Sequence, residues 1–247
     1  MLRTMREDLR AIFAKDPAAR SLPEVLLCYP GLHAIWSHRI AHALHRAGLE
    51  LPARLISNLS RWLTGVEIHP GAGIAPGVFI DHGAGVVIGE TAEIGSGCLR
   101  YQGAVLGGTS KEKKKRHPTL GKNVEVGAGA IILGPLRIGD GARIGAGSVV
   151  IRDVPAGATV IGVPGRVSLG FSPRDLEELQ HNRLPDPVAD AIKVIVKAQG
   201  ALEERISQLE SVEGITAAVD RAWEEKKEEI MAEFFPESEE FGEGEGI

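Results

Sequence analysis

Apolar residues recur every six positions through the middle of the chain, from about residue 66 to residue 167. Four positions after each of them comes a smaller or aliphatic side chain, with glycine or polar residues between. The recurring aliphatic residues are Ile68, Ile74, Ile80, Ile88, Ile94, Leu120, Val126, Ile132, Ile138, Ile144 and Val150. This period predicts a parallel β-helix, in which each unit forms a short strand and a corner, and about 18 residues complete one triangular coil.

The six-residue pattern is interrupted at two places. After Ile80 it slips by two residues, and we take Ala84 as the small position of that unit. Between Leu106 and Leu120 the spacing is 14 residues, close to two units, and the sequence GGTSKEKKKRHPT has no aliphatic residue. We expect residues 108–118 to form a loop that leaves the wall of the prism and is solvated or contacts a charged ligand.

Helical periodicity flanks the repeats on both sides, over residues 1–65 and again over residues 168–236. In the second region, apolar positions at 188–209 alternate four and three residues apart, as in a coiled-coil seam. That seam fits either three helices zipped in a trimer or packing against the protein's own prism. Residues 237–247 are acidic and glycine-rich and should form a flexible tail.

Composition narrows the functional class. The net charge of the 247 residues is −5, so bulk binding to nucleic acid is not expected. The sequence has no apolar run long enough to span a membrane and no apolar stretch of a signal peptide at its charged N-terminus, so we expect a cytoplasmic protein without a membrane partner. Cys28 and Cys98 make no disulfide framework, and we expect both in apolar packing.

Two pairs of reactive side chains interrupt the aliphatic pattern. Asp81-His82 lies on a coil, and Arg116-His117 lies at the base of the expected loop. A neutral imidazole can take the proton of an alcohol that attacks a thioester, while a nearby carboxylate orients the ring. Arginine suits a substrate carboxylate and aspartate a substrate ammonium. These residue types favour acyl transfer to the hydroxyl of an amino acid, although a single histidine at such a corner is as often a solvated turn residue.

The chain resembles the serine acetyltransferases of the hexapeptide acyltransferase superfamily. The resemblance runs from Asp16 to about Val167 and rests on EIHPGAGIAPGVFIDHGAGVVIGETAEIG, LGGTSKEKKKRHPTLGKNVEVGAGAIILG and VPAGATVIGVPGRV. It implies a left-handed parallel β-helix, against the usual right-handed crossover. It also implies transfer of the acetyl group of acetyl-CoA to the hydroxyl of L-serine, which gives O-acetyl-L-serine and CoA in the first step of cysteine biosynthesis.

The resemblance also implies catalytic and substrate-binding roles. His82 would be the general base, assisted by Glu67 at a position where many members carry aspartate. Asp16 and Asp81 would bind the ammonium group of serine. The longer arm of Glu67 leaves the geometry of this pair with His82 open.

Further roles implied by the resemblance concern the substrate carboxylate and acetyl-CoA. Arg116 and His117 would hold the carboxylate, with His117 also a catalytic candidate. Acetyl-CoA would be a co-substrate rather than a permanently bound cofactor, and the lysines from Lys111 onward could meet its phosphates. The groove for it would lie between subunits of a homotrimer, lined by Gly107, Gly108, Thr109, Ala128 and Ala146.

The resemblance suggests a protein partner as well. In this family a C-terminal isoleucine after an acidic stretch docks into O-acetylserine sulfhydrylase, and this chain ends in Ile247. A hexamer of two trimers is a further possibility. Three alternatives stay open: acetylation of another hydroxyl acceptor such as a sugar, a γ-type carbonic anhydrase with zinc on His69, His82 and His117, and a non-catalytic scaffold. The histidine spacings do not match those of the zinc enzyme, and we expect no metal.

Overall fold

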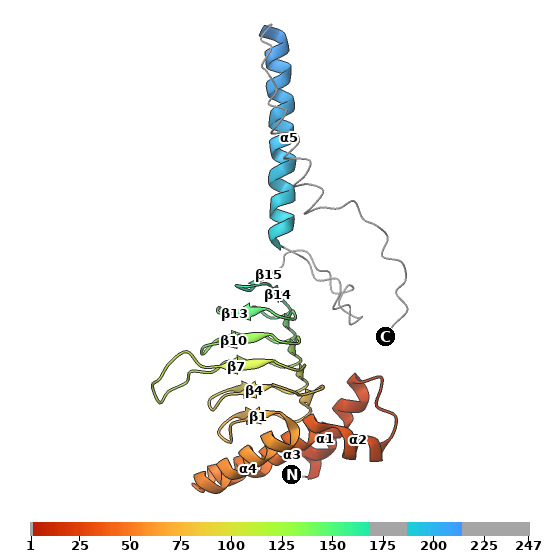
Figure 1. Ribbon diagram of the computed structural model, residues 1–247, viewed down its shortest axis with the longest axis vertical. Coiled ribbons are helices and arrows are strands. Elements are labelled where there is room, and N and C mark those ends of the chain that lie inside the picture. Colours follow the sequence, from red (N-terminus) through yellow and green to blue (C-terminus); the bar gives the residue numbers. More distant parts are fainter. Residues whose placement is uncertain (1, 168–186, 214–247) are drawn as a thin grey trace. The chain divides into compact units, whose positions relative to one another are not determined.

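The computed structural model describes residues 2–167 and 187–213 of the chain. These residues belong to two compact units, which divide between Asp186 and Pro187. Among these residues, the first unit contains four helices and a stack of short strands, and the second contains one long helix (Figure 1). None of the helices in these described ranges is long and apolar enough to cross a membrane.

Four helices precede the strands: α1 (Leu2–Lys15), α2 (Leu22–Cys28), α3 (Pro30–Arg46) and α4 (Glu50–Thr64). Ser21 caps α2, because its side chain accepts a hydrogen bond of 3.4 Å from the backbone N–H of Glu24. Helix α4 ends at Gly65, whose φ of 72° lies in the left-handed region that glycine adopts without strain. The chain then enters the first strand two residues later.

The strands form three sheets around a triangular prism, and strands β1 to β14 pair in parallel with the strand one coil away. The sheet orders are β1-β4-β7-β10-β13, β11-β8-β5-β2 and β15-β14-β12-β9-β6-β3, with only β14 and β15 antiparallel among these described pairs. The strands are β1 (Glu67–Ile68), β2 (Gly73–Ile74), β3 (Phe79–Ile80), β4 (Val87–Ile88), β5 (Glu93–Ile94), β6 (Leu99–Arg100), β7 (Val105–Gly107), β8 (Thr119–Leu120), β9 (Glu125–Val126), β10 (Ile131–Leu133), β11 (Arg137–Ile138), β12 (Arg143–Ile144), β13 (Val149–Val150), β14 (Thr159–Ile161) and β15 (Arg166–Val167).

The repeated aliphatic side chains fill the interior of the prism. On one sheet, residues 68, 88, 106, 132 and 150 stand in register from coil to coil, and all of them are buried. A single unit cannot bury its aliphatic residue, so the stacked coils share one core. The parallel β-helix predicted from the six-residue period is confirmed.

The first interruption differs from the sequence interpretation. Ala84 is exposed, and Val86 is buried in the interior position that we assigned to Ala84. The two extra residues therefore lie between Ile80 and Val86, in the corner that carries Asp81 and His82. The assignment of Ala84 to the interior was wrong because both Ala84 and Val86 fit the small position of the repeat, and the sequence does not show where the two extra residues lie.

The second interruption also differs. Ile88 pairs in register with Leu106, and Ile94 with Leu120, so a single corner separates β7 from β8. The spacing of 14 residues is thus one unit of six with eight extra residues, and not two units with two extra. This longer insertion forms the loop that projects from the prism between β7 and β8 (Figure 1).

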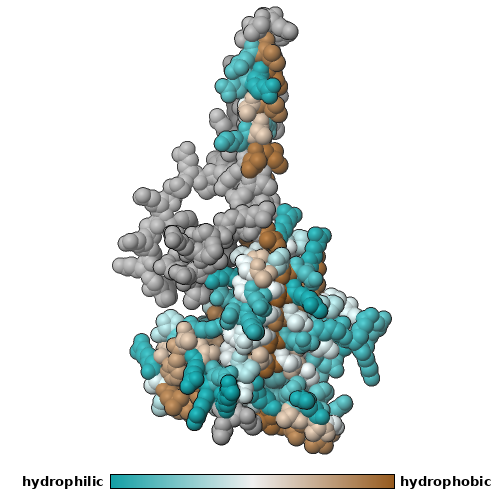
Figure 2. Space-filling model, turned by 180° about the vertical axis from the view of Figure 1, so that it is seen from behind, coloured by the Kyte–Doolittle hydropathy of each residue, from teal (hydrophilic) through white to brown (hydrophobic). Residues whose placement is uncertain are grey.

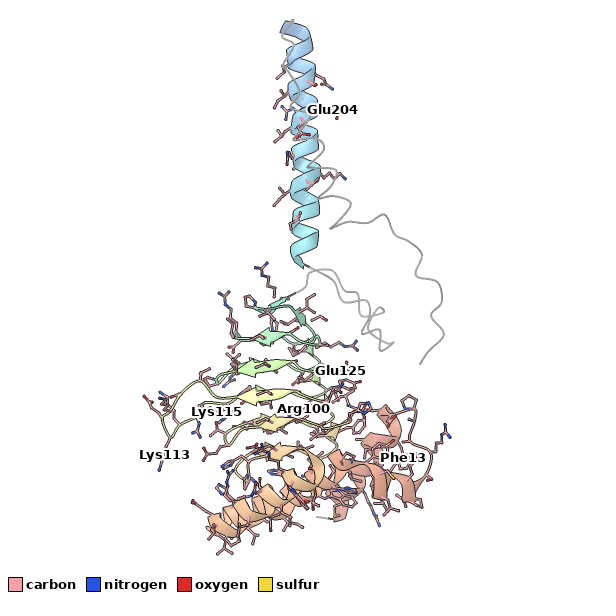
Figure 3. The ribbon with its side chains drawn as sticks, in the orientation of Figure 1. Phe13, Arg100, Lys113, Lys115, Glu125 and Glu204 are labelled. Carbon is pink, nitrogen blue, oxygen red and sulfur yellow. The ribbon has the colours of Figure 1, made fainter. Side chains whose placement is uncertain are left out.

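A charged side chain and a cysteine also lie within the prism. Arg100 occupies the interior position between Ile80 and Val126 (Figure 3), is fully buried, and its guanidinium nitrogens have no hydrogen-bond partner within the described part of the chain. The aliphatic pattern could not reveal this position. Cys98 is buried as expected, whereas Cys28, which we expected in apolar packing, is exposed on α2.

The second unit contains α5 (Pro187–Glu213), 27 residues long. Side chains of the expected seam are exposed along it, and Figure 2 shows apolar surface on this helix; they are Ile192, Ile195, Leu202, Ile206 and Leu209. The further helix expected before residue 236 and the tail 237–247 lie outside the described residues.

Candidate active site

The Asp81-His82 pair stands at the first corner insertion, directly after β3. His82 has a φ of 57°, which is unusual for a residue with a side chain, and its backbone N–H donates 2.9 Å to Oδ1 of Asp81. Its ring nitrogen Nε2 lies 3.8 Å from Oδ2 of Asp81, and the side chain of His82 is 72% exposed. Strained backbone of this kind clusters at functional sites, and here it presents an imidazole at the surface.

Asp16 lies close to the same corner. Its Oδ1 accepts 2.8 Å from the N–H of Ala18, and its Oδ2 accepts 2.5 Å from the hydroxyl of Tyr29. The pKa of Tyr29 is raised first by burial, then by the hydrogen bond and charge of Asp16, with a smaller contribution from Asp81. The pKa of Tyr101 is raised by burial and by the charges of Asp81, Glu125 and Asp16. The structure thus brings Asp16 and Asp81, the two expected ammonium ligands, around the same pair of tyrosines.

Packing of the N-terminal helices on the prism brings Asp16 to this place. A cluster outside the sheet of β3 and β6 buries side chains from α1 to α3 against both strands: Ile12, Val25, Leu32, Phe79 and Leu99. Gly31 of α3 touches β3 so closely that a Cβ there would lie 2.0 Å from the carbonyl oxygen of Ile80. Only glycine permits this contact.

His117 is buried beside the corner between β4 and β5, which lies one coil away from its own corner between β7 and β8. Its Nδ1 accepts a hydrogen bond of 3.2 Å from the N–H of Thr91 and lies 2.9 Å from the hydroxyl oxygen of that residue. A Cβ added at Gly89 would lie 1.9 Å from Cδ2 of His117, and one at Gly108 would lie 3.0 Å from its Nε2. The pKa of His117 is lowered by burial and by the adjacent Arg116 and Lys115, against an opposing effect of Glu90. The ring is therefore held neutral between two glycines.

Arg116 already contacts a carboxylate of the chain. Its Nη2 donates to Oε2 of Glu90, and its Nη1 donates 3.4 Å to the carbonyl oxygen of Glu112. Burial alone would raise the pKa of Glu90, but the hydrogen bond and charge of Arg116 bring that pKa below its usual value. Arg116 can thus hold a carboxylate, and its binding of the substrate carboxylate stays a prediction.

Glu67 does not have the expected partner. Its Oε2 forms an ion pair of 3.0 Å with Nη1 of Arg61 on α4, and no contact in residues 2–167 joins it to His82. His69, next to β1, accepts 3.0 Å from the N–H of Gly71 through Nδ1. The pKa of His69 is lowered by burial first and then by the charge of Arg54.

The residues expected to line the CoA groove lie on successive coils. Gly107 ends β7, Gly108 and Thr109 begin the loop, and the carbonyl oxygen of Ala128 accepts 2.8 Å from Gly147, next to Ala146. The loop lysines differ in setting: Lys115 Nζ donates 2.6 Å to the carbonyl oxygen of Thr91, whereas Lys113 lies at the outer end of the loop (Figure 3).

The zinc alternative gains no support from this geometry. In the described ranges, no three His, Cys, Asp or Glu side chains are grouped to hold a metal ion. Nδ1 of His69 and Nδ1 of His117 both accept backbone hydrogen bonds. His82 stands at a separate corner.

Residues that the sequence analysis missed complete the site: Tyr29, Gly89, Glu90 and Thr91. A signal was available for Glu90 and Thr91. The register of Ile94 on Leu120 is an offset of 26 residues, and the same offset places Glu90 beside Arg116 and Thr91 beside His117. Treating the second interruption as nearly two units concealed this relationship.

Comparison with known proteins agrees with the fold. Residues 117–152 match the family described as bacterial transferase hexapeptide (six repeats). The chain is 50% identical to the serine acetyltransferase of Synechococcus elongatus over 85% of both chains. It is 52% identical to that of Bacillus subtilis, over 85% of this chain and 93% of the other.

Solved structures give the same result. The serine acetyltransferase of Neisseria gonorrhoeae in complex with serine has a TM-score of 0.66 and 43% identity, over 68% of this chain and 69% of the other. The enzyme of Brucella abortus strain S19 in complex with coenzyme A has a TM-score of 0.66 and 39% identity, over 67% and 66% of the two chains. These matches also confirm that the β-helix is left-handed, as expected. With half of the aligned positions identical over most of its length, the chain belongs to the serine acetyltransferase family.

Proposed function

We propose that the protein transfers the acetyl group of acetyl-CoA to the hydroxyl of L-serine, which gives O-acetyl-L-serine and CoA. The observation that supports this most is the family membership together with the Asp81-His82 pair, which stands at the two-residue insertion of the coil. Related structures contain serine in one case and coenzyme A in another. Acetyl-CoA is a co-substrate in this proposal, and no permanently bound cofactor takes part.

In the proposed mechanism His82 is the general base. Its imidazole takes the proton from the serine hydroxyl while the oxygen attacks the thioester carbonyl carbon. When the tetrahedral intermediate collapses, the C–S bond breaks and the imidazolium returns the proton to the leaving thiolate. Asp81, with Oδ2 at 3.8 Å from Nε2, lies near enough to stabilise the imidazolium by its charge. Glu67, in its ion pair with Arg61, would have to exchange partners to assist His82 in the same way.

The other site residues hold the amino acid and the co-substrate. Asp16 and Asp81 bind the serine ammonium, and Arg116 with His117 binds its carboxylate. Glu90, which Arg116 holds in the free protein, shares or yields that guanidinium when the substrate carboxylate arrives. The groove residues that receive CoA are Gly107, Gly108, Thr109, Ala128 and Ala146.

The acceptor can be tested by measuring free thiol released from acetyl-CoA with serine, threonine, homoserine or no acceptor. The proposal predicts release that depends on serine. Equal release with homoserine or threonine would instead favour another hydroxyl acceptor, and release that needs no acceptor would contradict transfer to serine. Copurified zinc that is required for activity would favour the metalloenzyme alternative.

The assembly is proposed to be a homotrimer. Isoleucine and leucine at the alternating seam positions of α5 are typical of helices that associate in a coiled coil, and these side chains are exposed in the single chain. Replacing Ile195 and Leu202 by Asp should weaken the association of the trimer. A variant that stays trimeric but loses stability would favour packing of this seam on its own prism. The measured mass separates a trimer from a hexamer.

A partner is proposed for the C-terminus, which lies outside the described residues. The carboxylate and side chain of Ile247 would dock into O-acetylserine sulfhydrylase. Deleting Ile247 should abolish binding in titration calorimetry and leave acetyl transfer intact, and unchanged affinity would refute this partner. The proposed location is the cytoplasm, where thiols such as those of Cys28 and Cys98 stay reduced.

A further inference from the structure

We propose that Thr91 is a positioning residue, which anchors the end of the β7–β8 loop and fixes Arg116 and His117 to receive the substrate carboxylate. This inference rests on the proposed function for the identity of the substrate. Its structural part, the anchoring of the loop by one residue, depends only on contacts within this chain.

The anchor takes three consecutive residues of the loop end. The hydroxyl oxygen of Thr91 accepts hydrogen bonds of 3.0 Å from the N–H of Arg116 and 3.1 Å from the N–H of His117. Its carbonyl oxygen accepts 2.6 Å from Nζ of Lys115. The hydroxyl and carbonyl oxygens of Thr91 therefore hold the end of the eight-residue insertion where the loop rejoins the prism.

The same residue sets the tautomer of His117. A backbone N–H can only donate, so the contact of 3.2 Å from Thr91 N makes Nδ1 of His117 an acceptor. In the neutral ring the proton is then on Nε2, which is available to donate to a substrate carboxylate oxygen. The lowered pKa of His117, caused mainly by burial, acts in the same direction.

The stacking of coils explains why position 91 takes this role. The register of β5 on β8 places Thr91 directly beside His117, and Glu90 beside Arg116. Gly89 leaves space for the imidazole, since a Cβ at that position would overlap its ring. Without the threonine hydroxyl, two neighbouring N–H groups that are partly buried would lose their acceptor, and the loop end would lose its fixed position.

The test compares Thr91→Val, which keeps the shape and removes the hydroxyl, with Thr91→Ser, which keeps the hydroxyl. For Thr91→Val we expect the KM for serine to rise about tenfold or more, with kcat reduced far less and an unchanged KM for acetyl-CoA. Thr91→Ser should restore the KM for serine to within about threefold of the unmodified protein. Thr91→Ala takes the place of Thr91→Val if the valine variant does not fold.

The second readout is the ¹⁵N spectrum of His117 without substrate. The unmodified protein and Thr91→Ser should show an unprotonated Nδ1 and a protonated Nε2. Thr91→Val keeps the backbone N–H to Nδ1 but loses the hydroxyl that lies 2.9 Å from it, so the Nδ1 resonance should shift. Unmodified kinetics together with an unmodified His117 spectrum in Thr91→Val would overturn the inference. Failure of the unmodified protein to use serine would overturn the proposed function instead, because the spectrum reports the Thr91 contact independently of any substrate.

Discussion

The hydroxyl of Tyr29 donates a hydrogen bond of 2.5 Å to Oδ2 of Asp16, at the junction of α2 and α3. The second oxygen of Asp16 accepts from the backbone of Ala18, so both oxygens of this carboxylate are oriented. An aspartate held in this way keeps a fixed position for an incoming ammonium group, at low entropic cost.

Tyr29→Phe should therefore weaken the binding of serine. We expect the KM for serine to rise roughly three- to tenfold, as for the loss of a hydrogen bond worth about 1 kcal/mol, with a small change in kcat. Steady-state kinetics with serine varied at saturating acetyl-CoA makes the measurement, and the KM for acetyl-CoA is the internal control. An unchanged KM for serine would show that Tyr29 does not position Asp16 for the substrate.

Gly89→Ala should displace His117, because the new Cβ would lie 1.9 Å from Cδ2 of that ring. A misplacement of about 1 Å at a substrate-positioning group can cost about 100-fold in rate, so we expect kcat/KM for serine to fall by about that factor. Gly73→Ala on β2 is the matched control, since its nearest contact would be an ordinary 3.7 Å. Equal activity of the two variants would contradict the tight packing of His117.

Arg100→Met should stabilise the protein. The guanidinium of Arg100 is buried in the prism with no hydrogen-bond partner among the described residues, and burial lowers its pKa, so its charge is costly in this place. An apolar side chain of similar length should raise the free energy of unfolding by about 1–4 kcal/mol. Thermal or denaturant unfolding measures the change. A lower stability would indicate that the charge has a counterion in the assembled protein.

Buried histidines should make the protein less stable as the pH falls. Burial, with the charges of His42 and Arg39, lowers the pKa of His38 to about 3. The unfolded chain binds this proton near its ordinary pKa of about 6.5, so the stabilisation is complete above that pH and is lost as the pH falls towards 3. The free energy of unfolding should fall by up to about 1.4 kcal/mol for each pH unit in this range because of His38.

Urea unfolding of the unmodified protein and of His38→Gln between pH 7.5 and 5.0 tests this expectation. The variant should lose a large part of the dependence and retain the part due to His69 and His117, whose pKa values are also lowered by burial. Equal slopes for the two proteins would contradict the burial of a neutral His38.

The fold could be predicted from the sequence because the prism repeats one simple contact. Each aliphatic residue stacks on its equivalent one coil away, so the six-residue period alone predicts the sheets. Arg100 was missed because it fills an aliphatic position with a charge. Ala84 was assigned to the interior because the six-residue pattern does not show on which side of a small residue the two extra residues lie.

The reactive pairs of the site could be predicted, but not their supports. Asp81-His82 and Arg116-His117 stand out because they interrupt an aliphatic pattern. Tyr29 and Thr91 are ordinary residues whose roles arise from contacts across helices or coils, which depend on packing and on the true length of the loop insertion. Only the strand register gave that length.

The central claim is that the imidazole of His82 takes the proton from the serine hydroxyl. The most direct test is serine-dependent release of thiol from acetyl-CoA by His82→Ala, with the folded state checked by its unfolding transition. The account predicts a loss of roughly two to four orders of magnitude in kcat, with the folded protein otherwise unchanged. Turnover close to that of the unmodified protein would contradict it.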